Sequence, residues 1–146
     1  MGKTIWFNPE IKPADFAWMN RGTLGEVLDI QFSEIGPDYI KATMPVDSRT
    51  RQPFGLLHGG ASVALAETLG SVASWLIVNP EFFIGVGLEI NANHLRAVKS
   101  GRVTGVCMPL HIGGKTHVWE IKIYNETEEL CCISRLTVAV IAKNKI

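Results

Sequence analysis

The sequence has few cysteines, no excess of either charge, and no long apolar segment that is free of charged residues. Its three cysteines are odd in number, and Cys131 and Cys132 are adjacent, so they make a poor disulfide framework and favour a reducing cytoplasm. The 14 basic residues equal the 14 acidic ones, which excludes the positive surface of a general nucleic-acid binder. The most apolar stretch, 61–78, contains Glu67, and the N-terminus lacks the apolar core of a signal peptide. We therefore expect a cytoplasmic protein with no nucleic-acid or membrane partner.

Motifs for metals, nucleotides and serine hydrolases are missing as well. The four histidines fall in no metal-binding spacing, and the cysteines form no C-x-x-C pair. Residues 85–87 lack the third glycine of a dinucleotide fingerprint, and residues 113–115 do not form a P-loop. There is no G-x-S-x-G elbow of a serine hydrolase. We expect no metal and no cofactor.

The length of 146 residues suits one domain with its own hydrophobic core. We expect residues 1–24 to be a lead-in segment with a short helix over 14–19, and residues 25–146 to form the domain. Alternating apolar residues and turn signals predict strands over 26–34, 40–46, 84–94, 102–111, 116–124 and 130–142. A helix over 60–78 is apolar almost all round and must be buried. The predicted fold is therefore α+β, with an antiparallel sheet wrapped around one long helix.

The segment 51–61 leads into this helix and contains His58, Gly59 and Gly60. The first N–H groups of a helix lack intrahelical acceptors and carry a partial positive charge, and glycine lets an oxygen atom approach them closely. This chemistry suits an oxyanion hole. In the alternative interpretation, the glycines only permit a tight turn and His58 caps the helix or fills space in the core.

Glu67 is a carboxylate within an apolar helix, where burial is costly unless the group is paired, neutralised or functional. We expect a functional carboxylate, with a structural ion pair to an arginine as the alternative. Ser71 follows four residues later on the same helix face and suits the orientation of Glu67 or of a water molecule. It could equally be a small residue that fills space.

The spacing of Gly59 and Glu67 limits how they can act together. They are eight residues apart, which is about 12 Å along one helix and too far for both to touch one carbonyl group. If both serve one reaction, they come from different subunits. A two-fold dimer with antiparallel helices would create two equal sites, so we expect at least a dimer.

Basic residues gather loosely in the second half of the chain, at Arg96, Lys99, Arg102, Lys115 and Arg135. Solvated strand ends explain these positions as well as a phosphate site does. If the ligand carries phosphate groups, these side chains are its natural partners.

Several blocks of the sequence carry a family resemblance. They are Gln52 to Ser62, Ala66-Glu67, Val86 to His94, and shorter matches at 109–111, 118–119 and 130–136. Together they resemble the hotdog-fold acyl-CoA thioesterases of the PaaI-like group, over about Gly25 to Ile141. The resemblance implies a sheet around a central helix, a homodimer that pairs into a homotetramer, and active sites shared by two subunits.

The resemblance also implies roles for individual residues. Glu67 is implied as the catalytic carboxylate, the Gly59 N–H as the donor to the thioester carbonyl, Gln52 and His58 as positioning groups, and Ser71 as a helper of Glu67. The implied CoA-binding residues are Gly87, His94, Arg96, His111, Gly113, Gly114 and Lys115. The implied activity is hydrolysis of an aryl- or acyl-CoA thioester, with 1,4-dihydroxy-2-naphthoyl-CoA of menaquinone biosynthesis as the expected substrate.

Other functions stay open at this point. The enzyme could clear aryl groups from CoA or from a carrier protein, because Phe54, Val72 and Trp75 suit several ring shapes. A hotdog dehydratase would need a different acid–base pair from Gln52 and Glu67. A non-hydrolytic acyl-CoA-binding module would bind its ligand without turnover.

Overall fold

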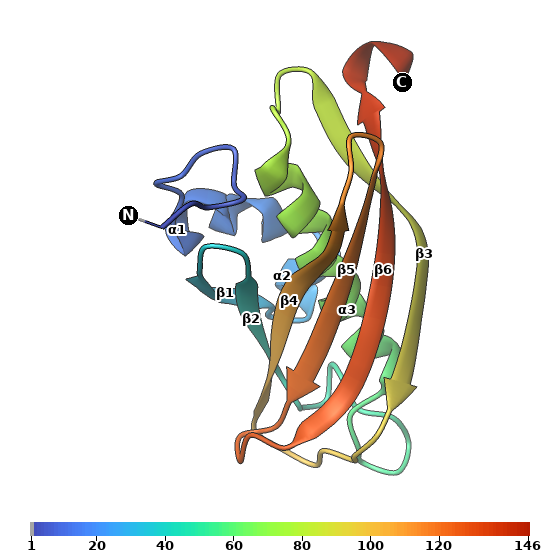
Figure 1. Cartoon of the computed structure of the whole chain (residues 1–146). Helices are drawn as coiled ribbons and strands as arrows, with labels where there is room; N and C mark the ends of the chain where they lie inside the picture. Colours follow the sequence, from blue (N-terminus) through green and yellow to red (C-terminus); the bar gives the residue numbers. More distant parts are fainter. Residues whose placement is uncertain (1) are drawn as a thin grey trace.

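Six antiparallel strands curve around the long helix α3 (Gly59–Ile77) in the computed structural model, which describes residues 2–146 (Figure 1). The strands are β1 (Gln31–Ile35), β2 (Ile40–Pro45), β3 (Phe83–His94), β4 (Arg102–Ile112), β5 (Thr116–Tyr124) and β6 (Leu130–Ala142). Their spatial order is β1-β2-β4-β5-β6-β3, so β1 and β3 are the two edges of the sheet. The predicted α+β fold, an antiparallel sheet around one long helix, is confirmed.

Alternation along the strands decides which side chains face α3. In β5, His117, Trp119, Ile121 and Ile123 are buried, while the residues between them are partly exposed. This period of two places every second side chain against the helix and the others on the outer face of the sheet. The core of the molecule therefore lies between α3 and the concave face of the sheet.

Small residues allow α3 to lie close to the sheet. A Cβ atom at Gly70 of α3 would lie 2.5 Å from Leu136 of β6, and one at Gly105 of β4 would lie 2.5 Å from Leu69 of α3.

By length and composition α3 could cross a membrane, with a mean hydropathy of 1.3 over its most apolar window. More than half of that window, 56%, is buried inside the fold, so α3 is apolar because it is the core helix of this domain.

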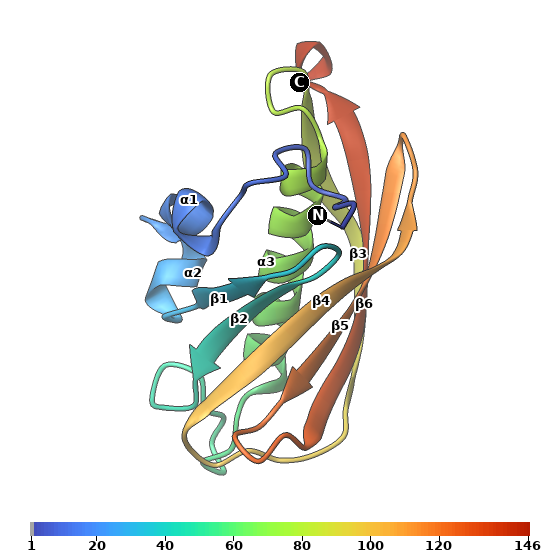
Figure 2. The ribbon, with the colours of Figure 1, turned by 60° about the vertical axis from the view of Figure 1, so that its left-hand side comes forward.

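The N-terminal segment covers the side of α3 opposite the sheet (Figure 2). It contains α1 (Pro13–Phe16), the 3-10 helix η1 (Ala17–Asn20) and α2 (Leu24–Val27). Phe16 is fully buried, and the Trp6 ring stacks on that of Trp119 with centroids 6.4 Å apart. This segment therefore shares the core of the domain, and the boundary between residues 24 and 25 stays a prediction.

The first predicted strand, 26–34, is wrong over its first half. Thr23 caps α2 by accepting a hydrogen bond from the Gly25 N–H, and Asp29 then adopts a left-handed conformation with φ 52°. The strand begins only after this turn, at Gln31. Leu28 and Ile30 are buried as their alternation suggested, but they reach the core from a helix end and a turn. The other predicted strands and the long helix agree with the structure to within two residues.

Candidate active site

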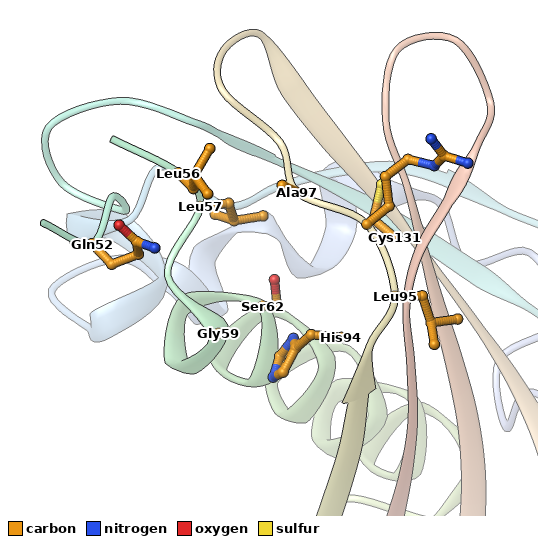
Figure 3. A pocket seen from close by; sticks show the side chains of 10 residues that line it. Gln52, Leu56, Leu57, Gly59, Ser62, His94, Leu95, Ala97 and Cys131 are labelled. Atoms are coloured by element: carbon orange, nitrogen blue, oxygen red, sulfur yellow. The ribbon is translucent and has the colours of Figure 1, made fainter. Parts of the chain in front are cut away.

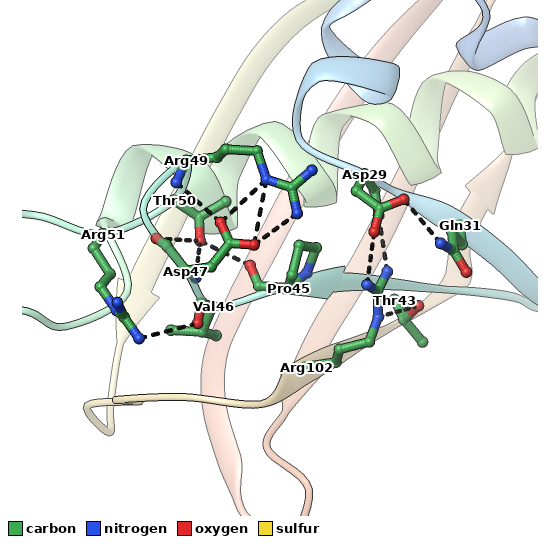
Figure 4. Close-up of polar contacts among 10 residues, drawn as sticks. All are labelled: Asp29, Gln31, Thr43, Pro45, Val46, Asp47, Arg49, Thr50, Arg51 and Arg102. Atoms are coloured by element: carbon green, nitrogen blue, oxygen red, sulfur yellow. Dashed lines mark hydrogen bonds and ion pairs between the residues drawn. The ribbon is translucent and has the colours of Figure 1, made fainter.

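A polar network fixes the loop that leads into α3 (Figure 4). Thr50, which is buried, donates its hydroxyl hydrogen to the Pro45 carbonyl at 2.7 Å and accepts from the Asp47 N–H at 3.1 Å. The Arg49 guanidinium lies 2.6 Å from the Asp47 carboxylate and holds the pKa of that carboxyl at about 2. Because the His58 N–H donates to the Thr50 carbonyl at 2.7 Å, this network places His58, the residue that directly precedes the helix.

Three of the four N–H groups in the first turn of α3 are already used. The Gly60 N–H donates to Nδ1 of His58 at 2.8 Å, and the N–H groups of Ala61 and Ser62 donate to the His58 carbonyl. Among residues 2–146, the Gly59 N–H has no acceptor. His58 therefore caps the helix, as in the alternative interpretation of the sequence. The capping leaves one helix-terminal N–H, that of Gly59, free for a ligand.

Gly59, which carries this free donor, lines a cavity of about 390 Å³ (Figure 3). Four of the predicted site residues line it, namely Gln52, Gly59, His94 and Arg96. They come from the loop before α3, the first turn of α3 and the end of β3. The fold thus brings together predicted catalytic and predicted CoA-binding residues that lie more than 30 positions apart in the chain.

Gln52 and His94 stand on either side of Gly59. The Gln52 Oε1 accepts a hydrogen bond from the Phe54 N–H, which leaves the side-chain NH₂ group to donate toward the cavity (Figure 3). A Cβ atom at Gly59 would lie 2.8 Å from Nε2 of His94, so the imidazole ring lies directly against the glycine backbone. A side chain at position 59 would displace this ring, so glycine allows His94 to keep its place beside the start of α3.

Arg96 lies at the cavity wall and forms an ion pair with Glu129 at 3.0 Å. Glu129 is held in turn by hydrogen bonds from the side chains of Asn125 and Thr127. The loose basic cluster expected from the sequence does not form one site, because Arg102 is committed to Asp29 at 2.9 Å in a separate network (Figure 4). Of that cluster, Arg96 is the member that lines the cavity.

Glu67 faces a different cavity, of about 260 Å³, between α3 and the N-terminal segment. Ser71 lines the same cavity, as expected for residues one helical turn apart. Glu67 is exposed in the single chain, so the expectation of a buried carboxylate is wrong for an isolated subunit. The alternative of a structural ion pair is not found either, since no cation within the described chain pairs with Glu67.

Gly87 of β3 makes room for the Glu67 carboxylate. A Cβ atom at Gly87 would lie 2.8 Å from Oε1 of Glu67. The carboxylate therefore rests over the backbone of an edge strand whose outer side pairs with no other strand in the described chain. This places Gly87 beside the predicted catalytic group, and away from the cavity that holds His94 and Arg96.

The predicted CoA-binding residues of the β4–β5 hairpin lie at the opposite end of the sheet from Gly59 (Figure 1). They are His111, Gly113, Gly114 and Lys115. The Lys115 carbonyl accepts from the Val140 N–H at 2.9 Å, near the C-terminal end of β6. Within one chain the hairpin does not join the Gly59 cavity, so the expected single set of CoA contacts is divided between the two ends of the molecule.

Ser62 and Cys131 line the Gly59 cavity although neither was assigned to the site. Both are 3% exposed, and the Ser62 hydroxyl points into the cavity (Figure 3). Ser62 lies three residues after Gly59 and so on the same helix face, which is the signal that could have found it. Burial raises the pKa of the Cys131 thiol, which keeps it protonated and poorly nucleophilic.

Comparisons with known proteins agree on one family. Residues 54–132 match the thioesterase superfamily. The chain is 58% identical over 123 residues to the 1,4-dihydroxy-2-naphthoyl-CoA hydrolase of Escherichia coli K12, covering 84% of this chain and 90% of that protein. It is 57% identical over 119 residues to the proofreading thioesterase EntH of Cronobacter turicensis, covering 82% and 86% of the two chains. The crystal structure of a glutamine-to-alanine mutant of thioesterase PA1618 from Pseudomonas aeruginosa superposes with a TM-score of 0.93 at 46% identity, covering 95% and 99%.

Proposed function

Since the chain belongs to the thioesterase superfamily and is a thioester hydrolase, we propose that it hydrolyses an aryl-CoA thioester at a site built from two copies of the chain. The expected physiological substrate is 1,4-dihydroxy-2-naphthoyl-CoA, an intermediate of menaquinone biosynthesis. No further cofactor is required, because CoA is part of the substrate. A cytoplasmic location stays a prediction.

The observation that carries the proposal is the division of the predicted catalytic groups between two cavities. Gly59 and Gln52 line one cavity, and Glu67 lines the other. Eight residues of helix separate Gly59 from Glu67, about 12 Å along the axis, so one chain cannot bring both to one carbonyl carbon. A second chain whose α3 runs antiparallel would place its Gly59 beside Glu67 of the first.

The edge strand β3 supports this arrangement. It is 12 residues long, pairs only with β6 among the described strands, and exposes Val86 and Leu88 by 40% and 63%. Long apolar edges invite pairing with another strand unless they are covered. Pairing of β3 with its copy would extend the sheet across a two-fold axis and cover the exposed carboxylate of Glu67. Association of two such dimers into a homotetramer remains an expectation.

In the proposed reaction, the thioester carbonyl oxygen accepts a hydrogen bond from the Gly59 N–H of one subunit. The helix terminus then stabilises the negative charge that develops on this oxygen as the carbon becomes tetrahedral. Glu67 of the other subunit delivers the attack, either directly or by taking a proton from water. When water attacks, the new C–O bond forms, the C–S bond breaks and the leaving thiolate takes up the proton that Glu67 removed from the water. When Glu67 attacks, the C–S bond breaks to leave an acyl–Glu67 anhydride, which a water molecule then hydrolyses, and the protons of this water go to the thiolate and to the acid. Both routes give free CoA thiol and the carboxylic acid.

The same dimer would reunite the divided CoA-binding residues. His94 and Arg96 lie at the end of β3 near the start of α3, and the hairpin with Lys115 lies at the other end of the sheet. A two-fold axis that sets the two copies of α3 antiparallel would bring the β4–β5 hairpin of one subunit to His94 and Arg96 of its partner. The basic side chains Arg96 and Lys115 would then be available to the phosphate groups of a single CoA molecule.

The names of two relatives suggest two different functions. The E. coli relative is named for the naphthoyl ester, and EntH is named as a proofreading thioesterase. A proofreading role agrees with our second candidate function, the clearance of aryl groups from CoA or from a carrier protein. The two candidates share one mechanism and differ in the selectivity for the acyl group and its carrier.

Steady-state thiol release from a panel of thioesters tests the proposal. The panel contains 1,4-dihydroxy-2-naphthoyl-CoA, benzoyl-CoA, alkyl-CoA esters and an aryl-loaded carrier protein. We expect a strong preference for the naphthoyl ester, and for Glu67→Gln a loss of kcat of at least ~10²–10³-fold, as for the loss of an oxyanion donor. Broad hydrolysis of all aryl esters would favour the clearing function, and undiminished turnover by Glu67→Gln would overturn the role of the carboxylate.

A further inference from the structure

Ser62 of α3 is a buried polar residue whose hydroxyl has no partner in the described chain. The buried polar residues are Thr50, Ser62, Ser74, His117 and Ser134. Thr50 and Ser134 donate to backbone carbonyls, and Ser74 accepts from Trp119 and lies 2.9 Å from Nδ1 of His117. Among residues 2–146, the Ser62 hydroxyl alone in this set takes part in no hydrogen bond. Since buried polar groups are nearly always paired, its partner has to come from elsewhere.

The Ser62 oxygen is open to the Gly59 cavity. In the described part of the chain, every side-chain nitrogen or oxygen atom of a buried or half-buried residue that is shielded from solvent has a hydrogen-bond partner. The unpartnered Ser62 oxygen is therefore not shielded, although the residue as a whole is only 3% exposed. Figure 3 shows this oxygen pointing into the cavity that Ser62 and Gly59 both line. A ligand atom in the cavity can therefore reach it.

Another hydroxyl of the same helix shows the arrangement that Ser62 does not adopt. Thr68 donates its hydroxyl hydrogen to the Ala64 carbonyl, one turn back, at 2.7 Å. Serine and threonine inside a helix commonly make this bond to the carbonyl four residues earlier. For Ser62 that acceptor would be the His58 carbonyl, which accepts from the backbone N–H groups of Ala61 and Ser62. The Ser62 hydroxyl is turned into the cavity instead.

Ser62 and Gly59 offer two free donors at one place. They lie three residues apart and so on the same face of α3. Helical side chains lean toward the N-terminus of their helix, so the Ser62 hydroxyl lies over the turn that Gly59 begins. Neither the Gly59 N–H nor the Ser62 O–H has an acceptor within residues 2–146. Two free donors at the positive end of a helix suit an oxygen atom that gains negative charge.

We propose that the Ser62 hydroxyl is a second oxyanion donor, which hydrogen-bonds the thioester carbonyl oxygen together with the Gly59 N–H. This inference rests on the proposed function, because it assumes that the carbonyl oxygen lies at Gly59. The bond strengthens as the carbonyl carbon becomes tetrahedral and its oxygen gains charge. Ser62 therefore lowers the barrier more than it tightens substrate binding. It transfers no proton, and its hydroxyl keeps its hydrogen throughout the reaction.

Ser62→Ala tests the proposal through the kinetics of benzoyl-CoA hydrolysis. We expect kcat to fall about 10²-fold with KM nearly unchanged, as for the loss of one oxyanion donor. The melting temperature should stay the same or rise, because no hydrogen bond within the chain is lost and alanine favours a helix. This combination separates a catalytic hydroxyl from a structural one, whose loss would lower stability.

Cys131→Ala is the matched control. Cys131 lines the same cavity and, like Ser62, is 3% exposed, so its variant measures the effect of enlarging the cavity by a small side-chain group. The Cys131 thiol is a weak donor and bonds to the Glu129 carbonyl at 3.3 Å, so it is not free for the substrate. We expect this variant to keep most of its turnover.

A ketone analogue of benzoyl-CoA, with CH₂ in place of sulfur, reports on the same hydrogen bond without turnover. Isotope-edited infrared spectroscopy measures the carbonyl stretch of the bound analogue, whose frequency falls when donors bind the oxygen. In Ser62→Ala the frequency should be higher than in the unchanged chain, and in Cys131→Ala it should be the same.

Three results would overturn the proposal: an unchanged kcat or a rise in KM alone for Ser62→Ala, an equal loss of kcat in Cys131→Ala, or an unchanged carbonyl frequency in Ser62→Ala. If the unchanged chain hydrolyses no thioester, the proposed function fails instead. The infrared measurement needs no turnover and still decides whether Ser62 donates to the carbonyl oxygen, so the two failures are distinguishable.

Discussion

At the scale of single residues, the start of α3 leaves one backbone donor uncommitted. The ring and carbonyl of His58 accept from the next three N–H groups, so the Gly59 N–H alone in that turn has no acceptor within the described residues. The sequence predicted the helix start and offered capping or catalysis as roles for His58. It could not show that capping is what singles out Gly59, because that depends on which way the ring turns.

Gly59→Ala separates activity from stability. The added Cβ would displace the His94 ring, whose Nε2 lies 2.8 Å from its position, while alanine suits a helix better than glycine. We expect an unchanged or higher melting temperature and a kcat/KM at least ~10-fold lower, since small displacements of positioning groups cost that much or more. The double variant Gly59→Ala/His94→Ala is the control. The double variant should be no less active than His94→Ala alone. If the losses of the two single variants instead add in the double variant, the clash between a side chain at position 59 and the His94 ring is contradicted.

His117 predicts a pH dependence of stability. It is buried beside Ser74, whose hydroxyl accepts from the Trp119 indole N–H at 2.7 Å and lies 2.9 Å from Nδ1 of His117. Burial lowers the pKa of His117, so the folded state resists the proton that the unfolded chain takes up near pH 6.5. The free energy of unfolding should therefore fall as the pH drops below about 6.5. Urea titrations between pH 7.5 and 5 measure this, and His117→Asn should flatten the curve; an unchanged slope would refute the assignment.

At the scale of elements, local signals predicted the helix and five of the six strands. They were wrong where a short helix and a turn have the alternating polarity of a strand. Residues 26–30 alternate in polarity, yet α2 and the left-handed Asp29 occupy them. The Ile30 N–H donates to the Gly25 carbonyl at 2.8 Å, and Arg102 of β4 anchors Asp29. Alternation alone could not reveal this, because the anchor comes from a strand more than 70 residues away.

The loop between β2 and α3 depends on the buried hydroxyl of Thr50. Thr50→Val keeps the shape of the side chain but leaves the Pro45 carbonyl and the Asp47 N–H without this partner. We expect a loss of about 1–3 kcal/mol in the free energy of unfolding. A lower kcat should accompany it, since the Thr50 carbonyl holds the His58 N–H. Urea denaturation and thiol release measure the two effects. Thr50→Ser retains the hydroxyl and should lose much less, and equal losses in both variants would refute the hydrogen-bond explanation.

At the scale of the whole molecule, the predicted site residues divide into groups that no single chain unites. Gln52, Gly59, His94 and Arg96 share one cavity, whereas Glu67 and the β4–β5 hairpin lie elsewhere. The helix spacing predicted this division for Gly59 and Glu67. The sequence did not predict the exposure of Glu67. An apolar helix is expected to be buried, but the single chain has no surface that covers Glu67, so a second surface has to do so.

Leu88→Arg tests whether that surface is a second copy. Leu88 is 63% exposed on the edge strand β3, where an arginine facing its symmetry mate would oppose pairing by like-charge repulsion and desolvation. We expect the variant to sediment as a monomer and to lose turnover even though every catalytic side chain is intact. Leu110→Arg is the matched control, since this leucine of β4 is 52% exposed and away from β3, and the variant should keep the dimer and its activity. If Leu88→Arg is a monomer in analytical ultracentrifugation and is still fully active, one chain completes the site. That result would refute the two-subunit site, which rests on the distance between Gly59 and Glu67 on a single helix.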